Sequence, residues 1–200
     1  KGVAAHNTNQ LWGSVTKALH WSIALLIICN IVIAQWISTL EVDVLGDPEM
    51  WQFLTPLHKS IGMIALILIV IRLVWAFCGT RPELPSDTPQ WQRNLTFSVH
   101  GLIYMLILLV PVAGYSASAS VGSRFELFWL FVVPNVVPKN ETISTVTYWI
   151  HFVGGWALAG MVALHAASAL WHHFFEKDDI LTRMLPRLGS DKSTSANPAE

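Results

Sequence analysis

Four long apolar stretches constrain the fold of this chain more than any other feature of its sequence. They lie at about residues 15–40, 58–78, 97–118 and 149–175. A bilayer core about 30 Å thick is crossed by roughly 20 predominantly apolar residues in a helix, so each stretch is long enough to span it. Only 12% of the residues are charged, whereas soluble domains carry roughly 25%. We therefore expect an all-α integral membrane protein.

The connections between the four spans favour a simple arrangement. They are short and rich in turn-forming residues, apart from a longer loop at about residues 120–146, and no internal repeat is visible. Such connections predict an antiparallel, up-down-up-down four-helix bundle. Residues 1–187 would form this transmembrane domain, and residues 188–200 a polar C-terminal tail. Pro111 should kink the third span without ending it, because neighbouring helices can satisfy the freed carbonyl group.

The lysines and arginines fall mostly on one side of the predicted bundle. That side carries Lys1, Lys17, Arg72, Arg81, Arg93, Lys177, Arg183, Arg187 and Lys192. The other side carries only Lys59, Arg124 and Lys139. Because positive residues are enriched in cytoplasmic loops, this distribution predicts that both termini are cytoplasmic. The net charge of -1 argues against a nucleic-acid partner, because nucleic-acid binding requires a basic surface. We expect the protein to be surrounded by membrane lipid.

Histidines are concentrated in the predicted spans. Six of the eight lie inside the spans or at their ends, namely His20, His58, His100, His151, His165 and His172. Ionisable side chains are costly in a membrane, so this concentration indicates function. In the predicted topology, His20 and His100 begin spans on the cytoplasmic side, whereas His58 and His151 begin spans on the outer side.

The last span offers two histidines on one face. His165 follows His151 by fourteen residues, which is about 21 Å along a helix, and the two side chains point in nearly the same direction. Pairing by depth places His58 opposite His151 near the outer surface. It places His20 opposite His165 near the inner surface, where His100 is a competing partner.

Paired imidazoles from facing helices are a standard axial ligation for low-spin haem iron. Two pairs predict two haems, and the lack of a C-x-x-C-H motif makes them b-type. Small residues about one turn after the ligands, Gly62, Gly154 and Gly155, would leave room for the macrocycle or let helices pack closely. The alternative for the histidines is a proton relay in a non-redox, proton-coupled transporter.

Two further residues have candidate roles near the inner surface. His172 follows His165 by seven residues, on nearly the same face, where a titratable group suits a quinone head group; it is equally an interfacial histidine solvated by lipid headgroups. Arg72, near the inner end of the second span, is a candidate partner for a haem propionate. Its alternative role is that of an interfacial arginine that sets the topology.

Several ordered motifs carry a family resemblance. Residues 18–21 read Ala-Leu-His-Trp, residues 57–62 Leu-His-Lys-Ser-Ile-Gly, residues 100–104 His-Gly-Leu-Ile-Tyr, residues 164–167 Leu-His-Ala-Ala, and residues 171–175 Trp-His-His-Phe-Phe. The set extends from about residue 19 to residue 187 and resembles the bacterial cytochrome b561 family. The resemblance implies a multi-pass protein of the bacterial inner membrane. It assigns His20 and His165 to a cytoplasmic haem, and His58 and His151 to an outer haem.

The resemblance also implies an activity. Electrons would pass from superoxide on the outer side to membrane ubiquinone, as in a superoxide:ubiquinone oxidoreductase. However, the predicted outer loops hold six acidic residues against three basic ones, which does not favour an anionic donor. A second possibility is therefore a membrane cytochrome b subunit that passes electrons between quinone and a partner dehydrogenase, hydrogenase or c-type cytochrome. The acidic loop would then be the docking surface.

Overall fold

The computed structural model describes residues 4–9, 11–42, 48–80, 82 and 88–186, and the predicted C-terminal tail lies outside them. Its main elements are α1 (Ser14–Val42), α2 (Pro48–Cys78), α3 (Gln90–Ser120) and α4 (Glu141–Trp171). Within the described part of the chain, these four helices are long and apolar enough to cross a membrane. The predicted all-α bundle with four spans is confirmed, and α3 continues through Pro111.

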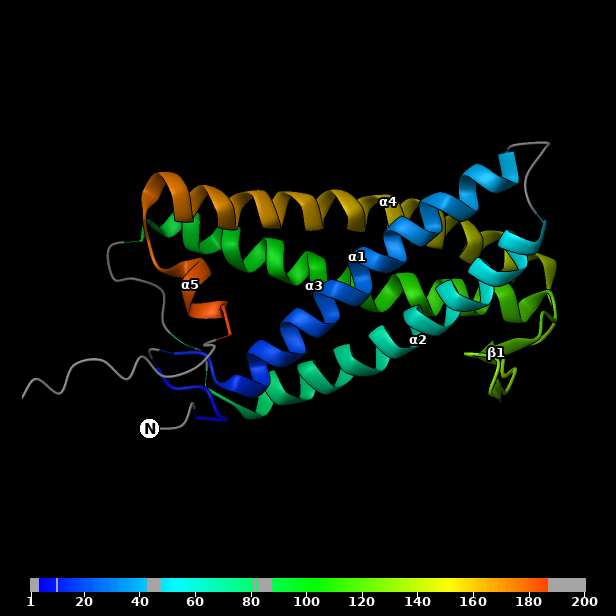
Figure 1. Ribbon diagram of the computed structural model, residues 1–200, viewed down its shortest axis with the longest axis horizontal. Coiled ribbons are helices and arrows are strands. Elements are labelled where there is room, and N and C mark those ends of the chain that lie inside the picture. The colour runs from blue at the N-terminus through cyan, green and yellow to red at the C-terminus, as the bar shows by residue number, and fades with distance from the viewer. Residues whose placement is uncertain (1–3, 10, 43–47, 81, 83–87, 187–200) are drawn as a thin grey trace, which may run out of the picture.

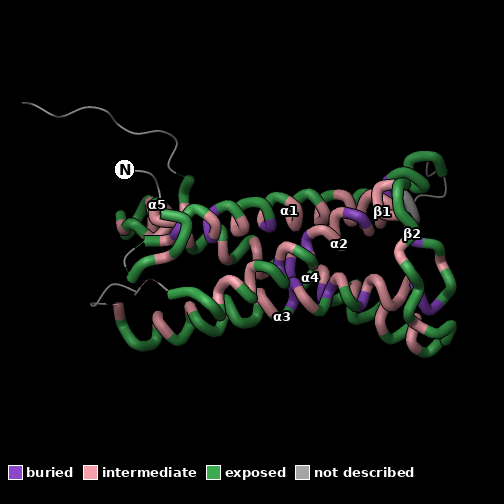
Figure 2. The backbone as a smooth tube through the Cα atoms, turned by 90° about the horizontal axis from the view of Figure 1, so that it is seen from below, coloured by how far each residue is buried: buried purple, intermediate pink, exposed green. Residues whose placement is uncertain are grey.

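Successive helices run in opposite directions (Figure 1). The N-terminal segment therefore lies at the same end of the bundle as the short helix α5 (Ile180–Met184), and we call this the α5 end. A two-stranded hairpin, β1 (Phe125–Leu127) and β2 (Phe131–Val133), lies at the opposite end, which we call the hairpin end. The helices pack chiefly as the pairs α1 with α2 and α3 with α4, and α2 joins the pairs through α3 (Figure 2).

The helices extend beyond the predicted spans, because apolar composition marks only the part that crosses the bilayer. α4 begins eight residues before its predicted span, at Glu141. Asn140 caps it, since the Asn140 Oδ1 atom accepts a hydrogen bond from the backbone N–H of Ile143 at 2.9 Å, as is typical of a helix N-cap. Polar residues that a hydropathy reading assigns to a loop thus form the first turns of the helix.

A small apolar core lies in the middle of the bundle. It contains Ile23 of α1, Ile69 of α2, Leu106 and Ile107 of α3, and Leu158 of α4. Large apolar side chains elsewhere on the helices are exposed, among them Leu25, Val74, Leu109 and Trp156. An exposed apolar surface on all four helices is what hydrocarbon surroundings require.

The hairpin replaces part of the loop expected at residues 120–146. Its strands pair antiparallel, with Leu127 opposite Phe131, and Phe128 and Trp129 in the turn have φ values of 48° and 59°. Ser60 of α2 holds the turn, because its buried Oγ atom accepts a hydrogen bond from the backbone N–H of Phe128 at 2.8 Å. This hairpin is not predictable from the local sequence, since turns with two positive φ values normally contain asparagine, aspartate or glycine.

Two side chains of α1 hold the C-terminal segment at the α5 end. The Trp21 indole N–H donates to the carbonyl oxygen of Met184 at 2.8 Å, and Lys17 Nζ donates to that of Leu185 at 3.0 Å. Between α4 and α5, the chain forms a π-helical turn, η1 (His172–Glu176). These contacts place the end of the last helix next to the start of the first.

Candidate functional site

The structure brings four of the histidines together as two pairs, both of which include α4. His58 of α2 and His151 lie at the hairpin end, with ring centroids 5.9 Å apart. His20 of α1 and His165 lie toward the α5 end, with ring centroids 6.4 Å apart. In both pairs the rings meet edge to face.

A third imidazole joins the pair near the α5 end. The ring of His100, on α3, lies 5.3 Å from that of His165, so His165 is flanked from both α1 and α3. The His100 Nδ1 atom lies 2.7 Å from the carbonyl oxygen of Thr96, which can only accept, so the proton is on Nδ1 and the Nε2 lone pair is free. His100 is exposed, however, whereas His20 is partly buried. Proximity alone does not decide between them as the partner of His165.

The ring of His151 is fixed by two features of α3. Its Nδ1 atom lies 2.8 Å from the carbonyl oxygen of Val110, so Nδ1 carries the proton and Nε2 has the lone pair. Gly114 leaves room for the ring, because a Cβ atom there would lie only 2.6 Å from the His151 Nδ1 atom. A ligating histidine typically donates its second N–H to a carbonyl group in this way, which sets the tautomer and orientation of the ring.

His58 lies among buried polar atoms. Within the described residues, its Nδ1 atom and the Oδ1 atom of Asn30 on α1 are buried without a hydrogen-bond partner. Asn30 also lies close to Gly62, one turn after His58, since a Cβ at Gly62 would be 3.3 Å from the Asn30 Nδ2 atom. Buried polar atoms without a partner are rare, so they indicate a site that takes a group from outside the polypeptide.

Both histidine pairs fit ligation of one metal ion from two sides. Two imidazoles bonded at about 2 Å to opposite sides of a metal ion would have ring centres roughly 6 Å apart. The measured separations of 5.9 Å and 6.4 Å fall close to this value. The donors are imidazole nitrogens, which haem iron accepts as axial ligands. The residues present therefore fit a haem at each level.

The glycines near the ligands divide between the two roles expected for them. A Cβ atom at Gly154 would meet Val110 of α3 at 3.0 Å, whereas one at Gly155 would meet nothing within 4 Å. Gly154 thus serves close packing of α4 on α3, and Gly155 borders open space.

Arg72 lies at the α5 end among groups from two other helices. Its Nε atom donates to the Tyr104 hydroxyl at 3.1 Å, and its Nη1 atom donates to the carbonyl oxygen of Thr16 at 3.2 Å. The guanidinium is close enough to His20 and His165 to act on both electrostatically. A guanidinium has five N–H donors, so donors remain for an anionic group beside this histidine pair.

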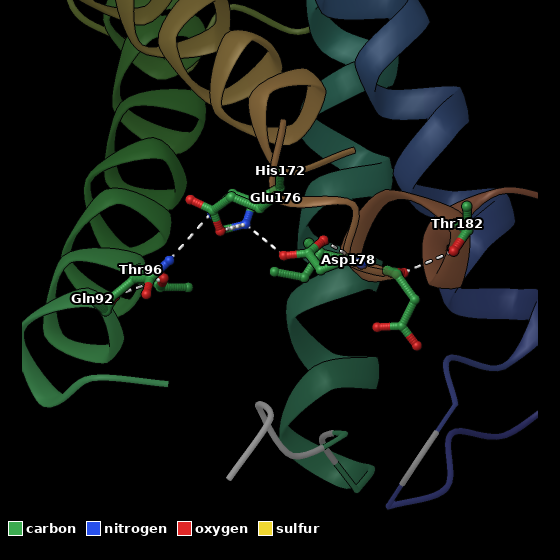
Figure 3. Close-up of polar contacts among 8 residues, drawn as sticks. Gln92, Thr96, His172, Glu176, Asp178 and Thr182 are labelled. Carbon is green, nitrogen blue, oxygen red and sulfur yellow. Dashed lines mark hydrogen bonds and ion pairs between the residues drawn. The ribbon is translucent and has the colours of Figure 1, made fainter. Parts of the chain in front are cut away.

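Two carboxylates contact one nitrogen of the His172 ring, a setting that the sequence did not reveal. Its Nδ1 atom is 2.6 Å from Asp178 Oδ2 and 2.8 Å from Glu176 Oε2. On the other side of the ring, its Nε2 atom is 3.4 Å from the Gln92 amide nitrogen (Figure 3). The sequence does not single out Glu176 or Gln92, because only the π-helical turn and the packing of α4 on α3 bring them to His172.

The cations of the hairpin end differ in their surroundings. Lys59 Nζ donates to the hydroxyl oxygens of Ser118 at 2.7 Å and Ser123 at 3.3 Å, and neither partner is charged. Arg124, in contrast, forms an ion pair with Glu126 at 2.7 Å. Lys59 therefore keeps an uncompensated charge at these contacts, next in sequence to His58.

Comparisons with known proteins agree with this geometry. The family model described as prokaryotic cytochrome b561 matches residues 11–187. Cytochrome b561 homolog 2 of Escherichia coli (strain K12) is 30% identical over 187 residues, which cover 92% of this chain and 96% of that protein. The probable superoxide oxidase CybB of Yersinia pestis is 28% identical over 170 residues, covering 84% and 92%. Cytochrome b562 of Cereibacter sphaeroides is 28% identical over 167 residues, covering 84% and 90%.

The family match extends over nearly the whole chain, including all four spanning helices and both histidine pairs. Membership carries with it the binding of haem b and a role in membrane electron transfer. The chain belongs to the prokaryotic cytochrome b561 family.

Proposed function

We propose that this chain is a two-haem membrane cytochrome that oxidises superoxide at the hairpin end and reduces ubiquinone at the α5 end. The observation that carries the proposal is the presence of two histidine pairs at two levels of the bundle, joined by α4. When bound, haem b supplies an iron that takes up and releases one electron at a time. The chain would contribute the histidines that hold the haems, the charged side chains near them and the residues that contact the quinone.

His58 and His151 would hold the haem at the hairpin end, and His20 and His165 the haem nearer the α5 end. The Val110 carbonyl orients His151 so that its Nε2 lone pair is the ligand. His20 is chosen over His100 because it is the more buried of the two and because Arg72 lies close to it. Arg72 would pair with a propionate of the same haem.

Lys59 supports an anionic donor despite the acidic outer loops. Its ammonium group is held by two serine hydroxyls and lies close enough to His58 to act on it electrostatically. A local positive charge attracts a small anion at close range even when the wider surface does not. Two superoxide anions would each lose one electron and leave as oxygen. One ubiquinone would gain both electrons and two protons and become ubiquinol.

His172 is the candidate for the quinone contact. Its Nδ1 atom is held by Asp178 and Glu176 at 2.6 Å and 2.8 Å, whereas its Nε2 atom has only the longer, 3.4 Å contact with Gln92. The Nε2 atom is therefore the one that would meet a quinone oxygen. The carboxylates hold the ring in place, and they favour a proton on Nδ1. A ring held in this way can accept a hydrogen bond from a quinol or, when doubly protonated, donate one to a quinone.

The charges at the two ends support an orientation with the α5 end in the cytoplasm and both termini there, in the bacterial inner membrane. Lys17, Arg72, Arg93, Lys177 and Arg183 belong to the α5 end, and Lys59, Arg124 and Lys139 to the hairpin end. The other cations counted on the inner side, Lys1, Arg81, Arg187 and Lys192, lie outside the described residues.

Haem content and donor chemistry test the proposal separately. We expect two b-type haems per purified chain, measured by haem quantitation and a dithionite-reduced spectrum, and we expect His151→Ala to lose one and keep the other. Rapid mixing with superoxide should then reduce the bound haem, and added ubiquinone should reoxidise it. A colourless protein would contradict the redox assignment. Haem that superoxide leaves oxidised, but that a soluble redox protein reduces, would instead support the role of a membrane subunit for a partner enzyme.

A further inference from the structure

We propose that His172, Glu176 and Asp178 form a binding site for one divalent transition-metal ion of the zinc type, at the α5 end. The three residues offer one imidazole nitrogen and two carboxylate oxygens, and these atoms all lie within 4.8 Å of one another. The site is separate from the two histidine pairs. Figure 3 shows that the two carboxylates, which come from the turn that follows α4, both contact the Nδ1 atom of His172.

The backbone is shaped so that these three side chains converge. In an ordinary α-helix, residues 172 and 178 would be about 600° of rotation apart and would not face each other. Here η1 widens the last turn, and Lys177 follows it in the left-handed region with φ of 56°. This reversal lets the Asp178 N–H donate to the carbonyl oxygen of His172 at 3.3 Å.

Charge at the cluster favours a cation over an ion pair. Both carboxylates lie within hydrogen-bond distance of the same nitrogen, Nδ1 of His172, but one N–H can satisfy only one of them well. With a neutral imidazole the cluster carries two negative charges, which a divalent ion would match. The nearby Arg183 forms its ion pair with Asp179, at 2.8 Å.

The ligand set selects the class of metal. Zinc binds histidine nitrogen and Asp or Glu oxygen at about 2.0–2.2 Å, and sites with three protein ligands leave a position for water. Calcium and magnesium prefer all-oxygen coordination. One nitrogen and two oxygens therefore indicate zinc or a similar first-row ion.

The surroundings of the cluster resemble those of built metal sites. The side chain of His172 is only 15% exposed, and Asp178 is held through its second oxygen, which accepts the backbone N–H of Ile180 at 3.1 Å. The Nε2 atom of His172 faces the amide of Gln92. If that amide is turned over, its oxygen can accept Nε2–H, which is the tautomer that metal binding at Nδ1 requires.

Occupation of the site would also affect quinone chemistry, a consequence that rests on the proposed function. A metal ion on Nδ1 fixes the proton on Nε2, so His172 could no longer exchange a proton with the quinone. Zinc should therefore slow ubiquinone reduction while leaving the reduction of the haem by superoxide unchanged.

Zinc binding to the purified, haem-loaded chain tests the site directly. After chelator treatment, we expect isothermal titration with zinc to give one saturable site per chain. His172→Gln and Asp178→Asn should each weaken binding by at least about tenfold, and Gln92→Leu by about 10- to 100-fold, as for other groups that orient a ligand. The matched controls are His173→Gln, the neighbouring histidine, and Glu141→Gln, a carboxylate at the other end of α4; both should bind zinc as the unaltered chain does. The haem spectrum of each variant reports whether it has folded.

Two results would overturn the proposal. One is the absence of saturable one-to-one binding; the other is equal loss of binding in the control variants. If a variant does not retain haem, X-ray absorption at the zinc edge of the unaltered chain decides, because the site predicts one imidazole and only nitrogen or oxygen neighbours. Direct zinc binding does not depend on superoxide or quinone, so its failure and that of the proposed function are distinguishable.

Discussion

Gly114 of α3 faces the ring of His151, and an alanine at this position tests whether that contact shapes the ligand site. The added Cβ would lie 2.6 Å from Nδ1 and 2.7 Å from Cε1 of the ring, so the ring must move. Movement would break the hydrogen bond of Nδ1 to the Val110 carbonyl oxygen. Overpacking costs about 1–3 kcal/mol, and the lost hydrogen bond about 0.5–1.5 kcal/mol.

The expected effect of Gly114→Ala is specific to one haem. Loss of a group that orients a metal ligand lowers affinity by about 10- to 100-fold, which is about 1.4–2.8 kcal/mol and agrees with the costs above. We therefore expect the purified variant to lose most of the haem at the hairpin end and to keep the other. Haem quantitation per chain and the reduced spectrum measure this directly.

Gly101→Ala is the matched control, because it lies on the same helix and a Cβ there would meet nothing within 4 Å. Alanine is favoured over glycine inside a helix by about 0.5–1 kcal/mol, so this variant should keep both haems and be at least as stable. A Gly114→Ala chain with full haem content, or a Gly101→Ala chain with the same loss, would refute the reasoning.

Three further variants test the remaining contacts. Lys59→Gln should slow haem reduction by superoxide on the order of tenfold and weaken the dependence of that rate on salt. Arg124→Gln removes the same charge from within an ion pair and is the control. An equal loss of rate in Arg124→Gln would show that superoxide is attracted by the overall charge of this end and not by Lys59 in particular. Haem quantitation should show that His20→Gln loses the haem nearer the α5 end, whereas His100→Gln keeps both haems. The reverse result would make His100, and not His20, the ligand opposite His165. Ser60→Ala should destabilise the hairpin by about 1–3 kcal/mol, visible as faster proteolysis at the hairpin with α2 intact; unchanged proteolysis would show that the Oγ contact to Phe128 does not hold the turn.

The helices were predictable because each depends on information within its own stretch of sequence. Apolar runs of bilayer length determine the four spans, and the spacing between His151 and His165 is fixed by the rise of the helix that contains both. The positions of the helix ends are harder to predict, since capping residues such as Asn140 lie in polar sequence. The hairpin was missed because Phe128 and Trp129 adopt positive φ values that a contact with Ser60, far away in sequence, stabilises.

Contacts between helices account for what the sequence left open. His20 and His100 have similar depth, and the sequence cannot tell how closely each approaches His165. In the structure, the rings of both lie close to the His165 ring. The convergence of Glu176 and Asp178 on His172 depends on a π-helical turn, which no local residue preference predicts. Asn30 is different, because a polar side chain inside a span is itself a signal of function and could have been singled out from the sequence.

The position of the core explains why α4 suits two separate ligand sites. Leu158 lies seven residues from both His151 and His165 and packs in the buried cluster with Ile23 and Ile69. Seven residues are about two helical turns, so on α4 the cluster lies midway between the two histidine levels. Any polar side chain introduced at this level would lie between the two ligand pairs without a partner, at a cost of about 1–3 kcal/mol. Apolar packing at Leu158 therefore keeps the two sites apart and holds the helices that carry them together.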